Sequence, residues 1–265
     1  MTVTDVNVVK SAIFERPDDA NKGTLGSLLC VCGSYGMAGA AVMSAKGALR
    51  TGIGLAKCAL PRSIYPIVAQ TILESVYYPL SENADGRISK VNVPFLVSES
   101  CKSSATLVGC GLGVCDDTLK IVFSLIENST TPLVLDADAL NCVAKQPEIL
   151  LRKKVPIIIT PHPGEMSRLT GLATPLVNAE RERVALDFAQ KYGVVTVLKG
   201  AGTVIASPNG KVLVNPTGNS GMATGGSGDV LAGIISSLLA QGNGCFTSRV
   251  AGVRIHRQAG KICRT

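Results

Sequence analysis

The chain has 265 residues, of which 46% are hydrophobic and 17% are charged. This composition predicts a large buried core and excludes an intrinsically disordered protein. The formal net charge of +7 suits anionic ligands, but the basic residues are scattered and only 4% of residues are aromatic, so we expect small anionic ligands and no nucleic acid.

Predicted strands and helices alternate through the first half of the chain. Apolar runs of strand length lie at residues 27–32, 53–59, 105–108 and 132–135, and helical patterns lie at residues 38–50 and 116–127. Gly86 and Pro94 indicate loops rather than a domain boundary.

The second half continues this alternation and adds a hairpin. Predicted strands lie at residues 155–160, 194–198, 203–206 and 211–214, and predicted helices lie at residues 178–192, 230–240 and 247–262. Asn209-Gly210 joins the last two strands and is typical of a β-hairpin. Residues 1–265 are therefore predicted to form one α/β domain, with a mainly parallel central sheet and helices on both faces.

Polar and glycine-rich segments follow the ends of the predicted strands. They are Gly33-Ser34, residues 109–113, Asp136 with Asp138, His162, and Lys199-Gly200. Ligands of parallel sheets bind at the carboxyl ends of the strands, so we expect one rim of the sheet to hold the functional site.

The strongest functional signal is Gly225-Gly226-Ser227-Gly228-Asp229, just before the helix predicted at residues 230–240. Small residues let a ligand approach the backbone, and the free N–H groups of a helix start stabilise a phosphate. A simple cap needs only one small residue, so we interpret Asp229 as a general base acting on a hydroxyl rather than as an N-cap. The sequence contains no P-loop motif and no dinucleotide-binding fingerprint.

Other groups on the rim could contribute to such a site. Lys199-Gly200-Ala201-Gly202-Thr203 offers a positive charge and open backbone donors to a phosphate, although a surface β-turn has a similar composition. Asp136 and Asp138 could bind magnesium through water, or one of them could cap the next helix. His162, held extended between two prolines, could bind substrate, exchange protons or be structural, whereas His256 is interpreted as structural.

The nine cysteines and one uncharged stretch bear on the compartment. No CxxC or paired zinc spacing occurs, so the cysteines are interpreted as small core residues in a reducing cytoplasm. Residues 23–45 carry no charge, but Gly33-Ser34-Tyr35-Gly36 interrupts them with a turn signal. With no signal peptide apparent, we expect a soluble cytoplasmic protein without a membrane segment.

Taken together, these segments resemble the ADP/ATP-dependent NAD(P)H-hydrate dehydratases of the ribokinase-like superfamily. The resemblance extends from Lys22 to Gly260. It is carried by the motifs at residues 22–26, 38–41, 48–52, 109–113, 135–140, 160–165, 199–203 and 221–233.

The resemblance implies a three-layer ribokinase-like fold and the repair of hydrated nicotinamide cofactors. The ring hydroxyl of the S-form of hydrated NADH or NADPH would be phosphorylated by ADP or ATP with Mg²⁺, and loss of phosphate would restore the reduced cofactor. By position, Asp229 resembles the family's catalytic base. The nucleotide-binding residues would be Lys199, Gly200, Ala201, Gly202, Thr203, Gly225, Gly226, Ser227 and Gly228. The substrate-binding residues would be Ala40 or Ala41, Gly111, His162 and Asp229, and no metal ligand is implied.

The chain departs from the family pattern at three places. Cys110 stands where proline is usual, Asn21 replaces a common histidine, and the chain stops soon after Ala259-Gly260, where family members usually continue into a closing helix. No epimerase domain precedes the matched segment, so we expect a separate NAD(P)H-hydrate epimerase, and the family suggests a homo-oligomer. Two alternatives remain, namely a ribokinase-like kinase of a small hydroxylated metabolite or vitamin precursor, and a non-catalytic nucleotide sensor on the same fold.

Overall fold

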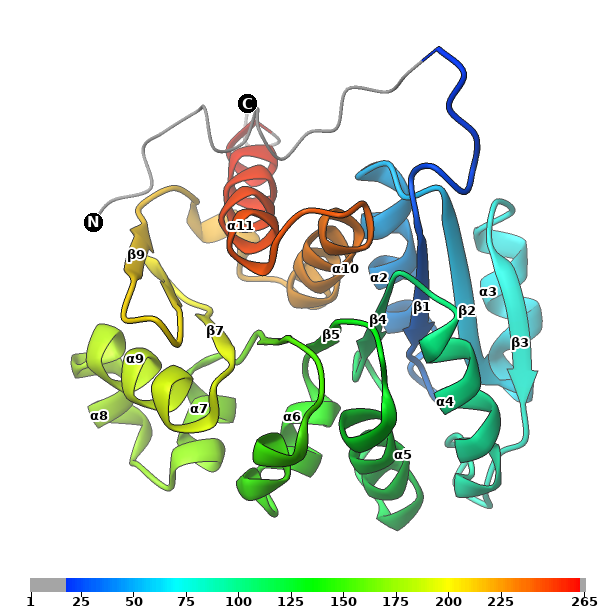
Figure 1. Cartoon of the computed structure of the whole chain (residues 1–265), viewed down its shortest axis with the longest axis horizontal. Helices are drawn as coiled ribbons and strands as arrows, with labels where there is room; N and C mark the ends of the chain where they lie inside the picture. Colours follow the sequence, from blue (N-terminus) through cyan, green and yellow to red (C-terminus); the bar gives the residue numbers. More distant parts are fainter. Residues whose placement is uncertain (1–17, 263–265) are drawn as a thin grey trace.

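The computed structural model describes residues 18–262, which form a nine-stranded sheet in the order β3-β2-β1-β4-β5-β6-β7-β8-β9 (Figure 1). The strands are β1 (Ser27–Val31), β2 (Leu55–Pro61), β3 (Val76–Leu80), β4 (Ala105–Val108), β5 (Leu133–Leu135), β6 (Ile157–Ile159), β7 (Val195–Leu198), β8 (Thr203–Ala206) and β9 (Val212–Asn215). The seven strands from β3 to β7 pair in parallel, and β8 and β9 pair antiparallel at one edge. The predicted mainly parallel sheet and the predicted hairpin are both confirmed.

Helices cover both faces of this sheet. On one face lie α2 (Ala38–Arg50), α3 (Tyr65–Thr71), α10 (Ser227–Ala240) and α11 (Cys245–Ile262). On the other face lie α4 (Val93–Cys101), α5 (Asp116–Asn128), α6 (Asp138–Val143), α7 (Pro163–Thr170), α8 (Thr174–Ala179) and α9 (Arg181–Tyr192). Four short 3₁₀ helices join these elements: η1 (Arg62–Ile64), η2 (Lys90–Asn92), η3 (Pro147–Arg152) and η4 (Ser220–Met222).

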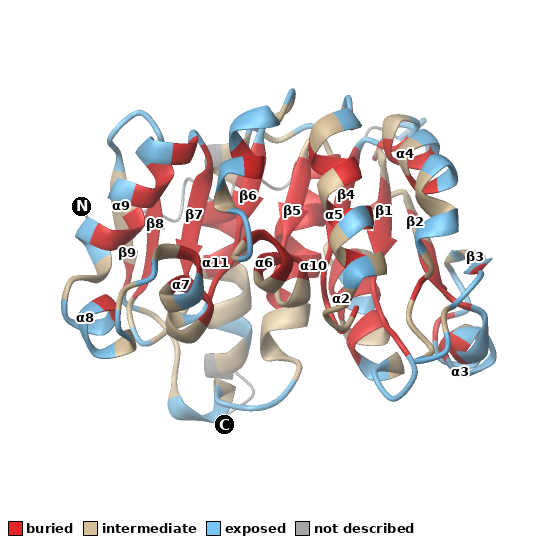
Figure 2. Ribbon diagram, turned by 90° about the horizontal axis from the view of Figure 1, so that it is seen from below, coloured by how far each residue is buried: buried red, intermediate tan, exposed pale blue. Residues whose placement is uncertain are grey.

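The sheet is buried between two hydrophobic cores because successive side chains of a strand point to opposite faces. In β1, Leu29 and Val31 belong to the core under α4 and α5, whereas Leu28 and Cys30 belong to the core under α2 and α10. Figure 2 shows the central strands buried and the outward sides of the helices exposed. The result is a three-layer α/β architecture.

Close contact between α2 and α10 positions the functional end of α10. A side chain at Gly233 would place its Cβ 2.1 Å from the backbone oxygen of Ser44, and one at Gly47 would place it 2.7 Å from the oxygen of Val230. Only glycine permits these approaches. The two glycines therefore let the first turn of α10 lie directly against α2.

Three sequence predictions of secondary structure were wrong in detail. The helix predicted at residues 178–192 begins only at Arg181, as α9, and residues 178–179 end the separate helix α8, because the backbone leaves the helical conformation at Glu180 (φ −123°, ψ 40°). Pro94 lies in the first turn of α4 rather than in a loop, a position where its missing N–H costs nothing. The sequence prediction also omitted β3, α3, α4, α6 and α7, which are short.

The described cysteines are free thiols, as predicted, and Cys30, Cys32, Cys58, Cys110 and Cys142 are buried. Within residues 18–262, no helix combines the length and the apolar character needed to cross a membrane.

Candidate active site

The site lies at the carboxyl ends of β1, β4, β5, β6 and β7, where the first turn of α10 meets their loops. Gly33 after β1 and Gly109 and Gly111 after β4 all have positive φ values. Such conformations favour glycine, which explains why the sequence places glycine after these strands. These loops surround the turn that contains Asp229.

The glycine turn leaves backbone donors free at the start of α10. Gly226 is the N-cap with φ +86°, and no side chain caps the helix there. The first N–H groups of a helix lack intrahelical acceptors, so those of Gly228 and Asp229 are available to an anion. Met43 of α2 packs on Gly226, because a Cβ at that position would meet its sulfur at 2.0 Å. This contact fixes the turn against the sheet.

Asp229 is the third residue of α10, and its surroundings disfavour ionisation of its carboxyl group. Burial raises its pKa to about 6, and the neighbouring carboxylate of Asp136 adds to the rise. The Cys110 thiol and the Lys199 ammonium act in the opposite direction. A carboxyl group with a pKa near the working pH suits a general base.

A buried ion pair lies beneath the glycine turn. Lys199 Nζ is 2.7 Å from Asp136 Oδ1 and 3.8 Å from Glu165 Oε2, and Asp136 is only 1% exposed. Burial disfavours the charged form of Lys199, but the two carboxylates outweigh it and raise its pKa. A Cβ at Gly228 would lie 3.3 Å from Lys199 Nζ, so the ammonium sits directly beside the turn. It therefore adds a positive charge where the free N–H groups converge.

Glu165 and His162 close the side of the site formed by α7. His162 Nδ1 accepts hydrogen bonds from the backbone N–H groups of Gly164 and Glu165 at 3.0 and 3.3 Å. In return, the backbone N–H of His162 donates to Glu165 Oε2 at 2.7 Å. Burial raises the pKa of Glu165 to about 7, against the opposing effect of Lys199. Burial and the charge of Lys199 lower the pKa of His162. His162 is thus the N-cap of α7, with a neutral ring at the edge of the site.

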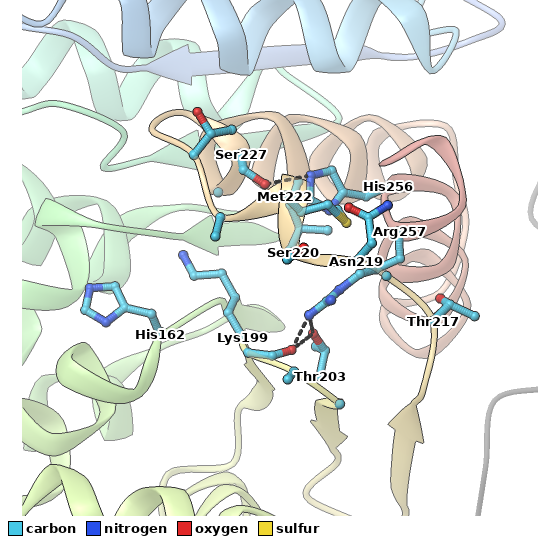
Figure 3. Close-up of a pocket in the computed structure, with 18 of the residues that line it drawn as sticks. His162, Lys199, Thr203, Thr217, Asn219, Ser220, Met222, Ser227, His256 and Arg257 are labelled. Atoms are coloured by element: carbon cyan, nitrogen blue, oxygen red, sulfur yellow. Dashed lines mark hydrogen bonds between the residues drawn. The ribbon is translucent and has the colours of Figure 1, made fainter. Parts of the chain in front are cut away.

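A cavity of about 670 Å³ opens on one side of the glycine turn (Figure 3). Its lining includes seven of the residues predicted to bind nucleotide: Lys199, Gly200, Ala201, Gly202, Thr203, Ser227 and Gly228. Gly225 and Gly226 are not among its lining residues, and His162 is. The two phosphate-friendly loops predicted from sequence therefore face a single cavity.

Two residues of α11 complete this cavity; the sequence analysis interpreted His256 as structural and did not single out Arg257. Arg257 donates to the Gly200 carbonyl and, at 3.0 Å, to Thr203 Oγ1, so that its guanidinium spans the loop after β7. His256 Nε2 lies 3.4 Å from Ser227 Oγ in the glycine turn. Burial and the charge of Arg257 lower the pKa of His256 to about 4, so its ring is neutral. Their one visible signal was that His256 is one of only two histidines in the chain.

Three of the residues predicted to bind the second substrate, Ala40, Ala41 and Gly111, do not line this cavity, whereas His162 does. A Cβ at Gly111 would come within 2.7 Å of the Ala40 Cβ, and one at Gly33 would lie 3.0 Å from the Ala41 Cβ. Ser34 Oγ donates to the Gly111 carbonyl at 2.8 Å. Ala40 and Gly111 are therefore direct neighbours, whereas Ala41 faces the loop after β1.

Asp136 and Asp138 have separate partners. Asp136 Oδ1 accepts from Lys199 Nζ and from Thr160 Oγ1, both at 2.7 Å. Asp138 Oδ2 accepts from the backbone N–H of Gly113 at 2.8 Å. Between them Ala137 adopts φ +48°, so the chain is not extended from Asp136 to Asp138 and the two carboxylates need not point the same way.

A family model for NAD(P)H-hydrate dehydratase matches residues 28–264. The bifunctional NAD(P)H-hydrate repair enzyme of Thermofilum pendens is 40% identical over 247 residues, covering 93% of this chain and 47% of that protein. The chain thus spans about half the length of several curated relatives that it matches.

Two further relatives match over most of their own length. The ADP-dependent (S)-NAD(P)H-hydrate dehydratase of Neisseria meningitidis serogroup B is 36% identical over 252 residues, covering 94% of this chain and 81% of that protein. The crystal structure of the ADP/ATP-dependent NAD(P)H-hydrate dehydratase from Bacillus subtilis, co-crystallised with ATP/Mg²⁺, superposes with a TM-score of 0.82 at 30% identity, covering 97% of this chain and 87% of that one. The predicted three-layer ribokinase-like fold is confirmed.

Proposed function

Because the chain belongs to the NAD(P)H-hydrate dehydratase family, we propose that it uses ADP or ATP to dehydrate the S-form of hydrated NADH or NADPH and so restores the reduced cofactor. The observation that carries this proposal is the position of Asp229. Its neighbour Gly228 lines the cavity together with the phosphate-binding loops, and a carboxylate oxygen of Asp229 lies within 4.8 Å of the sulfur of Cys110, next to the Gly111 loop that contacts Ala40. A base at this boundary can act on a hydroxyl from one side while a phosphoryl group arrives from the other.

The first step is phosphoryl transfer to the ring hydroxyl. The hydroxyl oxygen forms a bond to the terminal phosphorus of the nucleotide, the bond from that phosphorus to the leaving nucleotide breaks, and Asp229 takes the hydroxyl proton. The N–H groups of Gly228 and Asp229 and the ammonium of Lys199 face the oxygens that gain charge. Asp136 and Glu165 hold Lys199 in place for this role.

The second step is elimination. The phosphate leaves with the C–O electron pair and a proton is lost from the neighbouring ring carbon, which restores the double bond. Phosphate is a far better leaving group than hydroxide, so the nucleotide provides the driving force for dehydration. With ADP the products are the reduced cofactor, AMP and phosphate, and with ATP they are the reduced cofactor, ADP and phosphate.

The nucleotide would occupy the cavity along the loop after β7. Lys199, Gly200, Ala201, Gly202 and Thr203 form one wall, and Ser227 and Gly228 form the end nearest Asp229. Arg257 supplies a guanidinium to this cavity, where no carboxylate among the described residues pairs with it. A polyanionic phosphoryl donor is complementary to the positive charges of Lys199 and Arg257.

Magnesium fits this site only as a companion of the nucleotide. The Asp136 carboxylate is already engaged by Lys199 and Thr160, and Asp138 is engaged by the Gly113 N–H. The residues near the turn therefore do not form a protein-only magnesium site. The ion would be held by phosphate oxygens and water, where it neutralises phosphate charge.

The proposal is tested by the products of the reaction. Purified protein is mixed with hydrated NADH, Mg²⁺ and either ADP or ATP, and inorganic phosphate and reduced cofactor are quantified together. We expect one phosphate released for each NADH formed. A phosphorylated small molecule without release of phosphate would instead identify a kinase, and release of phosphate without NADH would contradict the dehydration step.

A further inference from the structure

A thiol lies between the two carboxylates at the centre of the site. Cys110 Sγ donates to Asp136 Oδ2 at 3.7 Å, and the sulfur, one carboxylate oxygen of Asp136 and one of Asp229 all lie within 4.8 Å of one another. The side chain of Cys110 is completely buried. Lys199 and Thr160 donate to Oδ1, the other oxygen of Asp136, so Oδ2 is the oxygen that accepts the hydrogen bond from the thiol.

The backbone holds this thiol in a fixed position. Cys110 is flanked by Gly109 (φ +128°) and Gly111 (φ +65°), and its carbonyl accepts from the Gly33 N–H at 2.8 Å. A Cβ at Gly109 would lie 1.8 Å from the backbone carbonyl oxygen of Asp136, so the loop after β4 packs closely against the end of β5. The backbone therefore holds Cys110 beside the carboxylates, and complete burial restricts its side chain.

The charged groups around Asp229 determine how readily its carboxyl group ionises. The carboxylates of Asp136 and Asp138, after β5, disfavour ionisation of Asp229, and the ammonium of Lys199, after β7, favours it. Lys199 is shared with Asp136 and Glu165 and cannot neutralise all three carboxylates. Cys32, directly after β1, adjoins the thiol, and the Cys32 contact and burial raise the pKa of Cys110, so its proton is retained. The thiol is thus a neutral donor placed where two negative charges meet.

We propose that Cys110 is a positioning residue of the active site, whose S–H bridges Asp136 and Asp229 and keeps Asp229 ionised and oriented as the base. A single proton serves both carboxylates because rotation about the Cβ–Sγ bond directs it to either one without moving a heavy atom. Where proline is found at this position, no such donor exists. This chain therefore sets the protonation of its base with a group that a proline cannot supply. The catalytic part of the inference rests on the proposed function, whereas the coupling between the three side chains does not.

The coupling is measured without turnover, by titrating protein labelled with ¹³C at aspartate carboxyl carbons. The signal of Asp229 is assigned by its loss in Asp229→Asn. In Cys110→Ala we expect its midpoint to rise by about 0.5–1 pH unit, since a hydrogen bond to a charged group is lost. Cys110→Ser retains a donor and should leave the midpoint at or below that of the natural chain.

Cys30→Ala is the matched control, because Cys30 is a buried thiol of β1 in the same core. Should Cys110→Ala not fold, Cys110→Val removes the donor with a side chain of similar volume. An Asp229 midpoint in Cys110→Ala or Cys110→Val that equals that of Cys30→Ala would overturn the proposal.

Kinetics then show whether the coupling matters for catalysis. The acidic limb of the pH profile of kcat/KM should move upward in Cys110→Ala by the same amount as the NMR midpoint, and should return in Cys110→Ser. A shifted midpoint in protein that never forms NADH would support the thiol bridge while contradicting the proposed function. An acidic limb that stays in place despite a shifted midpoint would overturn the positioning role.

Discussion

Three carboxyl groups and one ammonium lie close together at the reaction centre. Asp136, Glu165 and Asp229 all neighbour Lys199, and Asp136 and Glu165 are buried. One positive charge cannot satisfy three negative ones, so burial and repulsion raise the pKa of Asp229 to about 6 and that of Glu165 to about 7. The same crowding that makes Asp229 a useful base makes Lys199 necessary for a stable fold.

Removal of the Asp229 carboxylate tests its catalytic role. In Asp229→Asn we expect kcat to fall by about 10²–10⁴-fold, the usual contribution of a general base, with nucleotide affinity nearly unchanged. Steady-state kinetics and nucleotide titration measure the two effects. Asp116→Asn is the control, because Asp116 is an exposed carboxylate in the first turn of α5. Turnover that persists in Asp229→Asn would exclude this residue as the base.

The pH dependence follows from the raised pKa of Asp229. The base acts only when ionised, and its pKa is about 6. We therefore expect kcat/KM to fall about tenfold per pH unit below that value and to level off above it. A pH–rate profile measures this, with circular dichroism at each pH to show that the protein stays folded. An activity that is flat through this range would contradict the assignment.

Replacement of the buried ammonium tests the ion pair beneath the turn. Lys199→Met leaves the Asp136 and Glu165 carboxylates without their partner, and we expect a loss of about 3–5 kcal/mol in the free energy of unfolding. Urea denaturation measures the loss. Lys120→Met is the control, since Lys120 is exposed on α5, and it should change stability by less than about 0.5 kcal/mol. Equal stability of the two variants would show that the pair is not a structural requirement.

Sequence reasoning predicted single residues better than it predicted their partners. Asp229 was identified because three glycines and a helix start surround it in the sequence itself. The pairing of Lys199 with Asp136 joins residues 63 positions apart, and no local pattern shows it. For the same reason Arg257 was missed and His256 was interpreted only as structural, since their place in the cavity depends on how α11 packs back over the loop after β7.

At the level of elements, the contact between α2 and α10 brings the two sides of the site together. α2 carries Ala40, and α10 carries the glycine turn and Asp229. Gly47 and Gly233 allow the two helices to touch backbone to backbone. A wider spacing would separate the base from the loop at Gly111.

A substitution in this contact tests the arrangement. In Gly233→Ala the new Cβ would lie 2.1 Å from the Ser44 oxygen, so we expect a loss of about 1–3 kcal/mol in stability through overpacking, together with lower kcat. Thermal melting and kinetics measure both effects. Gly39→Ala is the matched control, because Gly39 is exposed in α2 and its Cβ would meet nothing closer than 4.0 Å. It should cause no loss, and similar behaviour of the two variants would contradict the packing argument.

The sequence predicted long, strongly patterned elements and missed short ones. The helix at Ala38–Arg50 and the strands at Ala105–Val108 and Thr203–Ala206 were predicted with their observed bounds. β3 and α7 were not predicted, because each has only five to eight residues and carries prolines or polar groups that obscure its pattern. The break at Glu180 occurs within a continuous amphipathic pattern, which periodicity alone cannot reveal.

For the molecule as a whole, the proposed reaction assigns the two sides of the sheet rim to two ligands. The cavity beside the loop after β7 has Lys199 and Arg257 for a polyanion, and the loops after β1 and β4 form the opposite side. Asp229 lies at the junction. This division is what a transfer reaction between two bound molecules requires, and it explains why glycine follows so many of the strands.

The most direct test follows the near-ultraviolet absorbance of the reduced nicotinamide ring while the purified protein is mixed with hydrated NADH, Mg²⁺ and either ADP or ATP. We expect absorbance to rise only when nucleotide is present, which also identifies the phosphoryl donor. A trace that stays flat with both nucleotides, while a thermal-shift assay shows that nucleotide still binds, would contradict the dehydratase assignment.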